Sequence, residues 1–386
     1  MTRYLLGDLV RNCKEKVDRD NNPYEYFVAG DHMETERPRL TMRGRFDAAD
    51  VGPAFIRLFR PGQVLHGSRR TYLKKVSVAD FEGVTSNVTF VLETKDEEVL
   101  PQRLLPFLLL SDRFTSYSIG KSKGSTNPYV LFSDLADFEV DLPGPARVAE
   151  IADVMCAAEQ VKENYRNLLA ACDDVVKSQF VEMFGDPDND PSNFSVETVK
   201  DAVLSISDGP FGSNLKSSHY VESDVRVLRL GNIKSGFFDD ADKAFITESH
   251  YETLKRYTCK PGDVIVGTLG EPNLRACIVP DYVPVSINKS DCVHITLNQD
   301  KLLARYVCTY FNLESTLRIA KKDMHGNTRS RITMSQVSAL PISVPPLELQ
   351  QEFADFAAQI DKSKFKSGTC GAMPSRYVDL PWRTAA

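Results

Sequence analysis

Two kinds of pattern divide the chain. Segments rich in Val, Thr and Ile, such as residues 87–92 and 292–297, alternate or cluster their apolar side chains in a way typical of strands. Longer apolar patterns predict helical stretches near residues 101–117 and 301–319. The mixture predicts an α/β (mixed α+β) fold with mostly strands.

These patterns occur twice, about 200 residues apart. Three pairs of segments keep nearly the same offset: 59–67 with 259–267, 27–31 with 228–232, and 124–126 with 326–328. In the first pair, a Pro-Gly step predicts a turn that leads into a short buried strand. A period of this length indicates two copies of a whole domain. Two similar but diverged domains on one chain can bind two similar but different targets.

A long helix is expected after the first copy. From Ile151 onwards, apolar or small residues recur at spacings of three and four, which is typical of a coiled-coil seam and implies a partner helix. The helix should end at Gly185, because a glycine followed by a proline such as Pro187 is a common helix stop. The expected seam residues are Ile151, Val154, Val161, Tyr165, Leu168, Val175 and Phe180.

The helix after the second copy begins similarly but is shorter. Phe353, Phe356 and Ile360 fall on one face, and the pattern falters at residues 362–366. The segment after residue 366 has no helical period, and we expect it to pack poorly. A seam left unpaired by the shorter helix would expose apolar surface on the long helix and favour self-association or reduced assembly.

Composition and cysteine usage narrow the class of protein. The 386-residue chain is 42% hydrophobic and 26% charged, which is typical of a globular protein long enough for two domains with their own cores. No apolar run approaches the roughly 20 residues that span a bilayer, and the first residues show no secretory leader. Eight cysteines include no Cys-x-x-Cys pair, so we expect reduced core thiols in a cytoplasmic protein without a membrane partner.

The net charge of −6 argues at first sight against nucleic acid as a partner. Most of this charge comes from residues 150–184, where seven acids outnumber three bases. Basic residues cluster at similar places in both copies. The clusters are Arg57, Arg60, Arg69, Arg70, Lys74 and Lys75, and Arg318, Lys321, Lys322, Arg329 and Arg331. Because phosphate binding depends on the local field, these clusters favour a nucleic-acid partner.

The motifs of common enzymes are missing from the sequence. Gly120-Lys121-Ser122 resembles the end of a phosphate-binding loop, but Thr115 stands where the first glycine is needed. Asp80 and Glu93-Thr94-Lys95 have the residue types of a nuclease metal site at too loose a spacing. The six histidines show no metal-ligand spacing, and no nucleophile elbow or nucleotide-cofactor fingerprint occurs. We therefore expect a protein that binds rather than catalyses.

Several segments resemble the specificity subunits of Type I restriction-modification systems. The segments similar to the family's target-recognition domain and to the ends of its spacer helices are 208–220, 227–233, 260–264, 180–187 and 340–353. The resemblance covers residues 145–365 well and residues 1–145 more weakly. A first domain whose sequence varies with its target would explain the weaker part.

This resemblance implies a non-catalytic subunit with two target-recognition domains. Each domain would bind one half of a two-part sequence in double-stranded DNA, and two antiparallel helices would set the spacing. Methyltransferase subunits would dock on the subunit and modify an adenine in each half, and restriction subunits would join for cleavage. S-adenosylmethionine, ATP and Mg²⁺ would be held by those partners, with no cofactor or metal on this chain.

The expected organisation follows from the repeat and the resemblance. Target-recognition domain 1 would occupy residues 1–145, a central spacer helix 146–186, target-recognition domain 2 187–345, a shortened distal spacer helix 346–366 and an irregular tail 367–386. The tail departs from the family, whose distal helix is nearly as long as the central one.

Groove chemistry selects the candidate DNA-binding residues, because Arg and Lys suit guanine edges and phosphates while Asn and Gln suit adenine. In the first copy they are Arg69, Arg70, Tyr72, Lys121, Lys123 and Asn127. In the second copy they are Ser213, Asn214, Lys216, Arg275, Asn288, Lys289, His325, Asn327, Arg329 and Arg331. The expected spacer or subunit-interface residues are the seven seam residues of the long helix together with Phe353, Phe356 and Ile360.

Two other interpretations stay open. A freestanding DNA-modifying enzyme, either a methyltransferase or a nuclease with duplicated recognition domains, would need a cofactor or metal motif that the sequence does not show. A coiled-coil scaffold that binds only proteins would show no salt-sensitive DNA binding.

Overall fold

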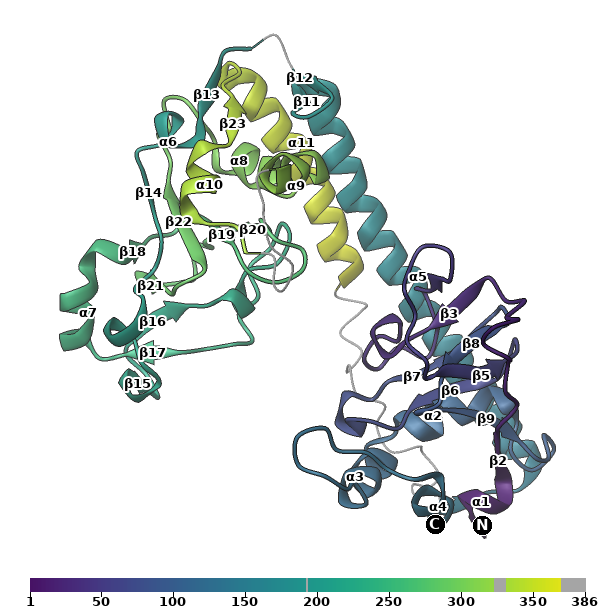
Figure 1. Ribbon diagram of the computed structural model, residues 1–386. Coiled ribbons are helices and arrows are strands. Elements are labelled where there is room, and N and C mark those ends of the chain that lie inside the picture. The colour runs from purple at the N-terminus through teal and green to yellow at the C-terminus, as the bar shows by residue number, and fades with distance from the viewer. Residues whose placement is uncertain (192–193, 323–330, 369–386) are drawn as a thin grey trace. The chain divides into compact units, whose positions relative to one another are not determined.

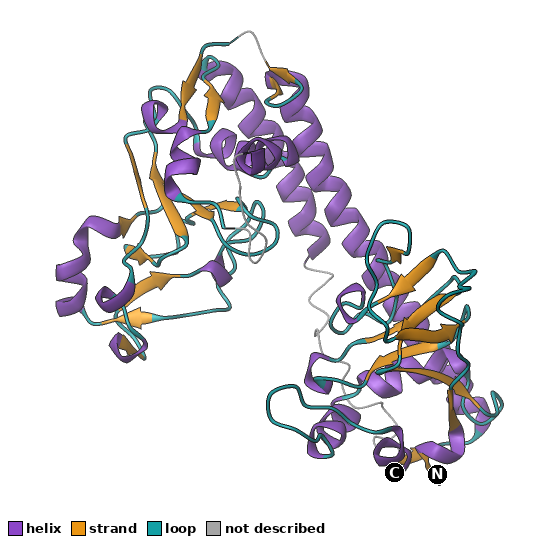
Figure 2. Cartoon of the chain, in the orientation of Figure 1, coloured by secondary structure: helices purple, strands orange, loops and turns teal. Residues whose placement is uncertain are grey.

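The computed structural model describes residues 1–191, 194–322 and 331–368 (Figure 1). The chain forms two compact units, Met1–Arg166 and Asn167–Thr369, joined by one continuous helix, α5 (Pro145–Phe184). Each unit is a mixture of short strands and helices (Figure 2).

Two four-stranded sheets form the centre of the first unit. The first has the order β2-β9-β6-β7 and is antiparallel throughout; the second has the order β4-β3-β8-β5, with β3 and β8 parallel. The strands are β2 (Val10–Cys13), β3 (Tyr26–Val28), β4 (Gly44–Arg45), β5 (Phe55–Phe59), β6 (Val64–Gly67), β7 (Val76–Val78), β8 (Gly83–Ser86) and β9 (Thr89–Thr94).

Short helices and the start of α5 complete the core of the first unit. Leu105–Leu110 is buried along its whole length, and packs in one cluster with Val64 and Leu92 of the first sheet and Ile151 of α5. The remaining elements are β1 (Thr2–Leu5), α1 (Leu6–Leu9), α2 (Leu105–Leu110), α3 (Asp112–Gly120), α4 (Phe132–Ala136) and β10 (Glu139–Leu142), which pairs with β1.

The second unit repeats this topology. Its sheets have the orders β14-β22-β19-β20 and β17-β16-β21-β18, with β15 added at one edge, and β16 and β21 are again the parallel pair. Its strands are β13 (Val196–Thr198), β14 (Ser205–Ser207), β15 (Tyr220–Val221), β16 (Val225–Leu228), β17 (Phe245–Ile246), β18 (Thr258–Cys259), β19 (Val264–Gly267), β20 (Ala276–Ile278), β21 (Ser286–Asn288), β22 (Cys292–Thr296) and β23 (Pro341–Ser343), and its helices are α6 (Val199–Ala202), α7 (Glu248–Leu254), α8 (Ala304–Phe311), α9 (Glu314–Lys322), α10 (Met334–Ala339) and α11 (Leu347–Gly368). The α/β class and the two similar domains predicted from the sequence are confirmed.

The repeat extends to single hydrogen bonds at the Pro-Gly turns. Gly62 and Gly262 have φ angles of 84° and 88°, which favour glycine. Gly62 N donates to Ala79 O at 3.0 Å, and Gly262 N donates to Val279 O at 2.9 Å. The two turns therefore lead into β6 and β19 through the same backbone contacts.

Each helical stretch predicted as a single helix is instead two helices. In the first copy the break falls at Ser111, whose backbone is extended and whose hydroxyl accepts from Phe114 N at 3.2 Å to cap α3. In the second copy it falls at Asn312, whose side chain donates to Ala276 O and Cys308 O and so ends α8. The strand predicted at 87–92 was also placed two residues early, since β9 begins at Thr89.

Both long helices contribute to the second unit. The α5 helix ends at Phe184, and Gly185 follows with a φ of 81°, as predicted. Phe180 and Phe184 pack with Tyr306 and Phe353, with ring centroids 4.9–5.6 Å apart. These four aromatic side chains join the end of α5, the start of α11 and α8 in one core.

The second long helix, expected over residues 346–366, agrees with α11 to within two residues at each end, although its apolar pattern falters at 362–366. The helix continues to Gly368, and Lys364 stabilises its last turns by pairing with Asp173 on α5 and with Asp361 one turn earlier. Of the tail predicted from residue 367, residues 369–386 lie outside the described part of the chain.

Burial makes the cysteines of the second unit weakly acidic. Cys259, Cys277, Cys292 and Cys308 are free and buried, and burial raises the pKa of Cys292 and Cys308 to about 12. These thiols are therefore protonated and unreactive at neutral pH. No helix in the described ranges is long and apolar enough to cross a membrane.

A buried histidine distinguishes the two copies. His66 on β6 stacks on Phe90 with centroids 5.9 Å apart and meets the edge of Phe114, while Val266 occupies the equivalent place on β19. Burial lowers the pKa of His66 from 6.5 to about 4. The folded first unit therefore holds this imidazole neutral at pH values where an unfolded chain would protonate it.

We predict that acid weakens the first unit through His66. As pH falls from 6.5 to 4 the unfolded state gains a proton that the folded state does not take, and the loss levels off below the folded pKa. The 2.5-unit difference corresponds to about 3 kcal/mol of unfolding free energy. Hydrogen exchange of peptides covering β6 should show this loss in wild type but not in His66→Val, with β19 as internal control. Equal acid sensitivity of wild type and variant would contradict the prediction.

Candidate nucleic-acid interface

Backbone hydrogen bonds join two loops of the first unit, residues 68–74 after β6 and residues 121–130 after α3. Val130 N donates to Ser68 O at 2.9 Å, and Arg70 N donates to Pro128 O at 2.7 Å. Lys123 and Tyr129 exchange two further backbone bonds, of 2.8 and 2.9 Å. The two loops therefore form one ordered surface although about 50 residues separate them in sequence.

All six candidate DNA-binding residues of the first copy lie on these two loops and are exposed. They are Arg69, Arg70, Tyr72, Lys121, Lys123 and Asn127. Arg70 adopts the left-handed conformation, with φ 51°, at the start of the short 3₁₀ turn Thr71–Leu73. This turn brings the two arginines and the half-exposed Tyr72 to the same loop tip.

Charges on this surface are unequally neutralised. Lys123 Nζ lies 2.8 Å from Asp134, and its hydrogen bond lowers the pKa of that carboxyl. Lys121 Nζ lies 5.4 Å from the Tyr117 ring centroid. Within the described ranges, neither Arg69 nor Arg70 has a carboxylate partner, so both guanidinium groups remain available to an anionic ligand.

The second unit joins its equivalent loops in the same way. Ile332 N donates to Thr268 O at 3.0 Å, as Val130 does to Ser68, and Leu269 pairs with Arg331 as a bridge. The candidates His325, Asn327 and Arg329 lie outside the described residues.

A further loop contributes to the second surface. Ser213 and Asn214 belong to the 3₁₀ turn Gly212–Asn214, and both are exposed, as is Lys216. Gly209 at the base of this loop lies against Lys289, where a Cβ atom would come within 2.2 Å of the backbone carbonyl. Glycine is therefore required there for the loop to approach the end of β21.

Arg331 links the loop of the Gly212–Asn214 turn to the two loops that the Ile332–Thr268 hydrogen bond joins. Its guanidinium pairs with Asp291 at 2.7 Å and lies 5.6 Å from the Phe211 ring centroid. Lys289 Nζ lies 5.6 Å from the Tyr220 ring centroid. Cationic and aromatic side chains thus lie together on the second surface, next to the polar Gly212–Asn214 turn.

Two candidates of the second copy make their contacts within the domain, although Arg275 is only partly buried. Arg275 donates to four backbone carbonyls, with Ile233 O at 2.8 Å and Leu269 O at 2.9 Å the closest. Asn288 is fully buried and donates to Cys292 O at 2.6 Å. Their contacts orient the backbone of the recognition loops, which identifies a supporting role.

Sequence reasoning found Tyr72 but missed one further exposed aromatic on each surface. Tyr129 and Phe211 are 41% and 47% exposed, which is unusual for large aromatic side chains. Each follows or adjoins a proline in a polar loop, and that pattern is the signal that could have identified them.

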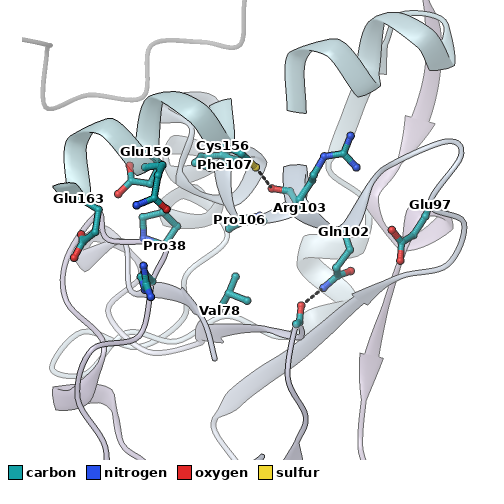
Figure 3. Close-up of a pocket in the computed structure, with 13 residues that line it drawn as sticks. Pro38, Val78, Glu97, Gln102, Arg103, Pro106, Phe107, Cys156, Glu159 and Glu163 are labelled. Carbon is teal, nitrogen blue, oxygen red and sulfur yellow. Dashed lines mark hydrogen bonds between the residues drawn. The ribbon is translucent and has the colours of Figure 1, made fainter. Parts of the chain in front are cut away.

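A cavity of about 430 Å³ in the first unit lies elsewhere, between the sheet-and-helix body and α5 (Figure 3). Phe107, Pro38 and Cys156 line it together with the carboxylates of Glu159 and Glu163. Arg39 and Arg103 also line this cavity, which lies apart from the two loops that carry the candidate DNA-binding residues. No cluster of three metal-ligating side chains occurs in the part of the chain that the structure describes.

The family match concerns the second unit alone. Residues 213–368 match the family model of the Type I restriction modification DNA specificity domain. These residues form a Type I restriction-modification DNA specificity domain. For these residues the family predicted from the sequence is confirmed, and the function of such a domain is sequence-specific DNA recognition.

Three solved structures are similar to nearly the whole chain. The S subunit from M. genitalium aligns with a TM-score of 0.49 and 12% identity over 95% of this chain and 90% of that chain. A chain from work on complex assembly and conformational transition of the type I R-M system gives 0.46 and 17% over 97% and 93%, and the HsdS subunit from Thermoanaerobacter tengcongensis gives 0.38 and 17% over 97% and 92%. No curated protein matches the chain.

We predict that Arg275→Ala loosens the specificity domain itself. Removing the guanidinium leaves four carbonyls without their charged donor, and hydrogen bonds to charged groups contribute about 1.5–3 kcal/mol each. Hydrogen exchange around β19 and β20 should accelerate strongly. Arg275→Lys should lose less, since Lys75 at the equivalent place in the first unit donates to Gly30 O at 2.5 Å.

Lys289→Ala is the matched control for this prediction, because it removes a cation from the surface without uncovering buried carbonyls. Unchanged exchange in Arg275→Ala together with weakened DNA binding would show instead that Arg275 contacts DNA directly.

Proposed function

We propose that the chain is the non-catalytic DNA-specificity subunit of a Type I restriction-modification complex, in which each unit reads one half of a two-part target in double-stranded DNA. The observation that carries this proposal is the recurrence, in both units, of the same pair of loops joined by the same backbone bond, Val130 to Ser68 and Ile332 to Thr268. The specificity domain in the second unit supports extending the function to its structural repeat.

In the first unit, Arg69 and Arg70 are the main readers. Guanidinium groups form paired hydrogen bonds with guanine O6 and N7 and also bind phosphates. Both lie at an exposed loop tip that backbone bonds hold in place, so little ordering is needed on binding. Lys121, Lys123 and Asn127 on the neighbouring loop extend the contact along the DNA.

The second unit reads a different half-sequence. Leu269, Gly270 and Pro272 stand where the first unit has Arg69, Arg70 and Tyr72. Its cations and amides come instead from the loop of Ser213, Asn214 and Lys216 and from Lys289 and Arg331. The same pair of joined loops thus carries a different set of hydrogen-bond donors and acceptors in each unit, as a target with two different halves requires.

Other subunits supply the chemistry in this proposal. Methyltransferase subunits bind S-adenosylmethionine and modify an adenine in each half, and restriction subunits use ATP and Mg²⁺ for translocation and cleavage in the cytoplasm. The long helices α5 and α11 provide the spacer and the docking surfaces; Phe356 and Ile360 are half-buried on α11, and Phe353 serves the core that joins the two helices. In this proposal the partner subunits, and not this chain, hold the cofactors and the metal.

The test is a methylome. The chain is expressed with its cognate methyltransferase subunit in an unmethylated host, and modified adenines are mapped by long-read sequencing. We expect a two-part motif with a constant gap. Arg69→Ala combined with Arg70→Ala should relax or abolish one half of the motif and leave the other half unchanged. An uninterrupted motif, or loss of both halves together, would contradict the assignment of one half to each unit.

Salt dependence provides a second prediction for the same variant. Each lost phosphate contact lowers the slope of log K against log salt by about 0.9, so two lost contacts lower it by about 1.8. Arg45→Ala is the control, since Arg45 is equally exposed but already paired with Asp47 and Glu25. DNA titrations of the assembled complex at several salt concentrations measure both slopes. An unchanged slope would place the two arginines away from the DNA backbone.

A further inference from the structure

One position on the joined loops differs in chemistry between the two units although its backbone contacts are the same. Tyr129 pairs with Arg69 as a bridge in the first unit, and Arg331 pairs with Leu269 in the second. The next residue in each copy makes the hydrogen bond that joins the two loops. Tyr129 and Arg331 therefore occupy equivalent places, and both are exposed.

The residue that precedes β9 or β22 is a second such position. Ser68 donates to Val88 O through both its backbone N and its hydroxyl. Thr268 donates to Asp291 O in the same way, at 2.9 and 3.1 Å. Val88 and Asp291 are therefore equivalent, and the second unit has arginine and aspartate where the first has tyrosine and valine.

The arginine and the aspartate of the second unit form an ion pair. Arg331 Nη2 lies 2.7 Å from Asp291 Oδ1, and this oxygen is buried from solvent. Asp291 has a φ of 66°, in the left-handed region that residues other than glycine seldom adopt and that recurs at functional sites. The turn that contains it is closed by Cys292 N, which donates to Lys289 O at 3.1 Å. The backbone therefore fixes the place of this carboxylate before any ligand binds.

Two further groups lie beside the guanidinium. Arg331 Cζ lies 5.6 Å from the centroid of the exposed Phe211 ring. The carboxylate of Asp208, at the base of the same loop, accepts from Gly209 N at 3.0 Å and from the backbone N of Asp291. Burial raises the pKa of the Asp208 carboxyl, and the charge of Arg331 opposes that rise. The guanidinium is thus placed by an aromatic ring and by carboxylates of its own domain.

We propose that Arg331 reads a guanine in the second half of the target, and that Asp291 is the residue that positions it. This inference rests on the proposed function and names the base that one side chain of the site recognises. Guanine presents two acceptors, O6 and N7, in the major groove, and a guanidinium can donate to both. A guanidinium has more N–H donors than one carboxylate accepts, so Arg331 can keep its ion pair while it binds the base.

The ion pair favours a base over a phosphate as the ligand. A phosphate binds an arginine mainly through charge, and the charge of Arg331 is already offset by Asp291. A base edge is read through the direction of the donors, which the fixed carboxylate and the Phe211 ring set in advance. Adenine has an amino donor where guanine has O6, so it would place donor against donor. Tyr129 in the first unit has a single hydroxyl and cannot form the paired bonds.

Binding of the assembled complex to DNA that carries 7-deazaguanine tests the contact. This base keeps O6 but has a carbon in place of N7, so it lacks one of the two acceptors. Replacing one guanine of the second half should weaken wild-type binding about 10-fold and should not weaken binding of Arg331→Ala further. Equal weakening of both proteins, or no sensitive guanine in that half, would overturn the inference.

Asp291→Asn separates positioning from folding. Asparagine is similar in size and tolerates the left-handed conformation, so hydrogen exchange of β22 should match wild type. The penalty from 7-deazaguanine should fall from about 10-fold to about threefold, because the guanidinium loses the charge that orients it. Since this variant keeps the arginine, it carries the test even where Arg331→Ala binds too weakly to titrate. An undiminished penalty would overturn the positioning role.

Lys216→Ala is the matched control, because it removes an exposed cation from the same surface. Its binding should weaken by the same factor for every sequence, and its slope of log K against log salt should fall by about 0.9. Arg331→Ala should keep the wild-type slope, since the charge it removes is already paired. A lowered slope with unchanged base preference would assign Arg331 to a phosphate and overturn the inference.

The methylome separates this inference from the proposed function. In Arg331→Ala, one guanine should become degenerate in the half that Arg69→Ala combined with Arg70→Ala leaves unchanged, and every other position should be kept. A two-part motif that Arg331→Ala leaves unaltered would overturn this inference alone. A wild-type complex without a two-part motif would overturn the proposed function on which it rests.

Discussion

The backbone hydrogen bond between Val130 and Ser68, and its repeat between Ile332 and Thr268, is the constraint on which both recognition surfaces depend. It holds together two loops that follow different elements. Because it uses only main-chain atoms, the side chains beside it are free to differ. The second unit can therefore have Leu269 where the first has Arg69 and still keep its two loops joined. The two units share an architecture but expose different side chains.

Beneath each frame, the two copies use different side chains for the same structural task. Lys75 donates to Gly30 O, and Arg275 at the same place in the repeat donates to Leu230 O and three further carbonyls. His66 and Val266 fill the same site on β6 and β19. Both copies keep the same backbone contacts and fill the same space in the core. Their side chains can therefore differ in charge and in pKa while the fold stays the same.

Much of this architecture could be predicted from sequence, because glycine and proline act locally. The turns at Gly62 and Gly262 and the end of α5 before Gly185 need only a left-handed residue at a fixed place. The break at Ser111 could not be predicted in this way, since an apolar run on both sides hides a single capping hydroxyl. The contacts of Arg275 with Leu230 O and Ile233 O come from a distant segment, which no local pattern reveals.

The apolar pattern of α5 predicted the helix and its periodicity, but it did not show what covers the apolar residues. The apolar row was expected to face a partner helix or subunit. Ile151 near its start and Phe180 near its end are buried in this chain, while Val154, Val161, Leu168 and Val175 are exposed. Buried residues of α5 shift around the helix from Ile151 to Val176, because 3.6 residues per turn drift against a seven-residue repeat. A helix that serves two cores along its length must therefore leave a third strip uncovered, and in this chain that strip is apolar.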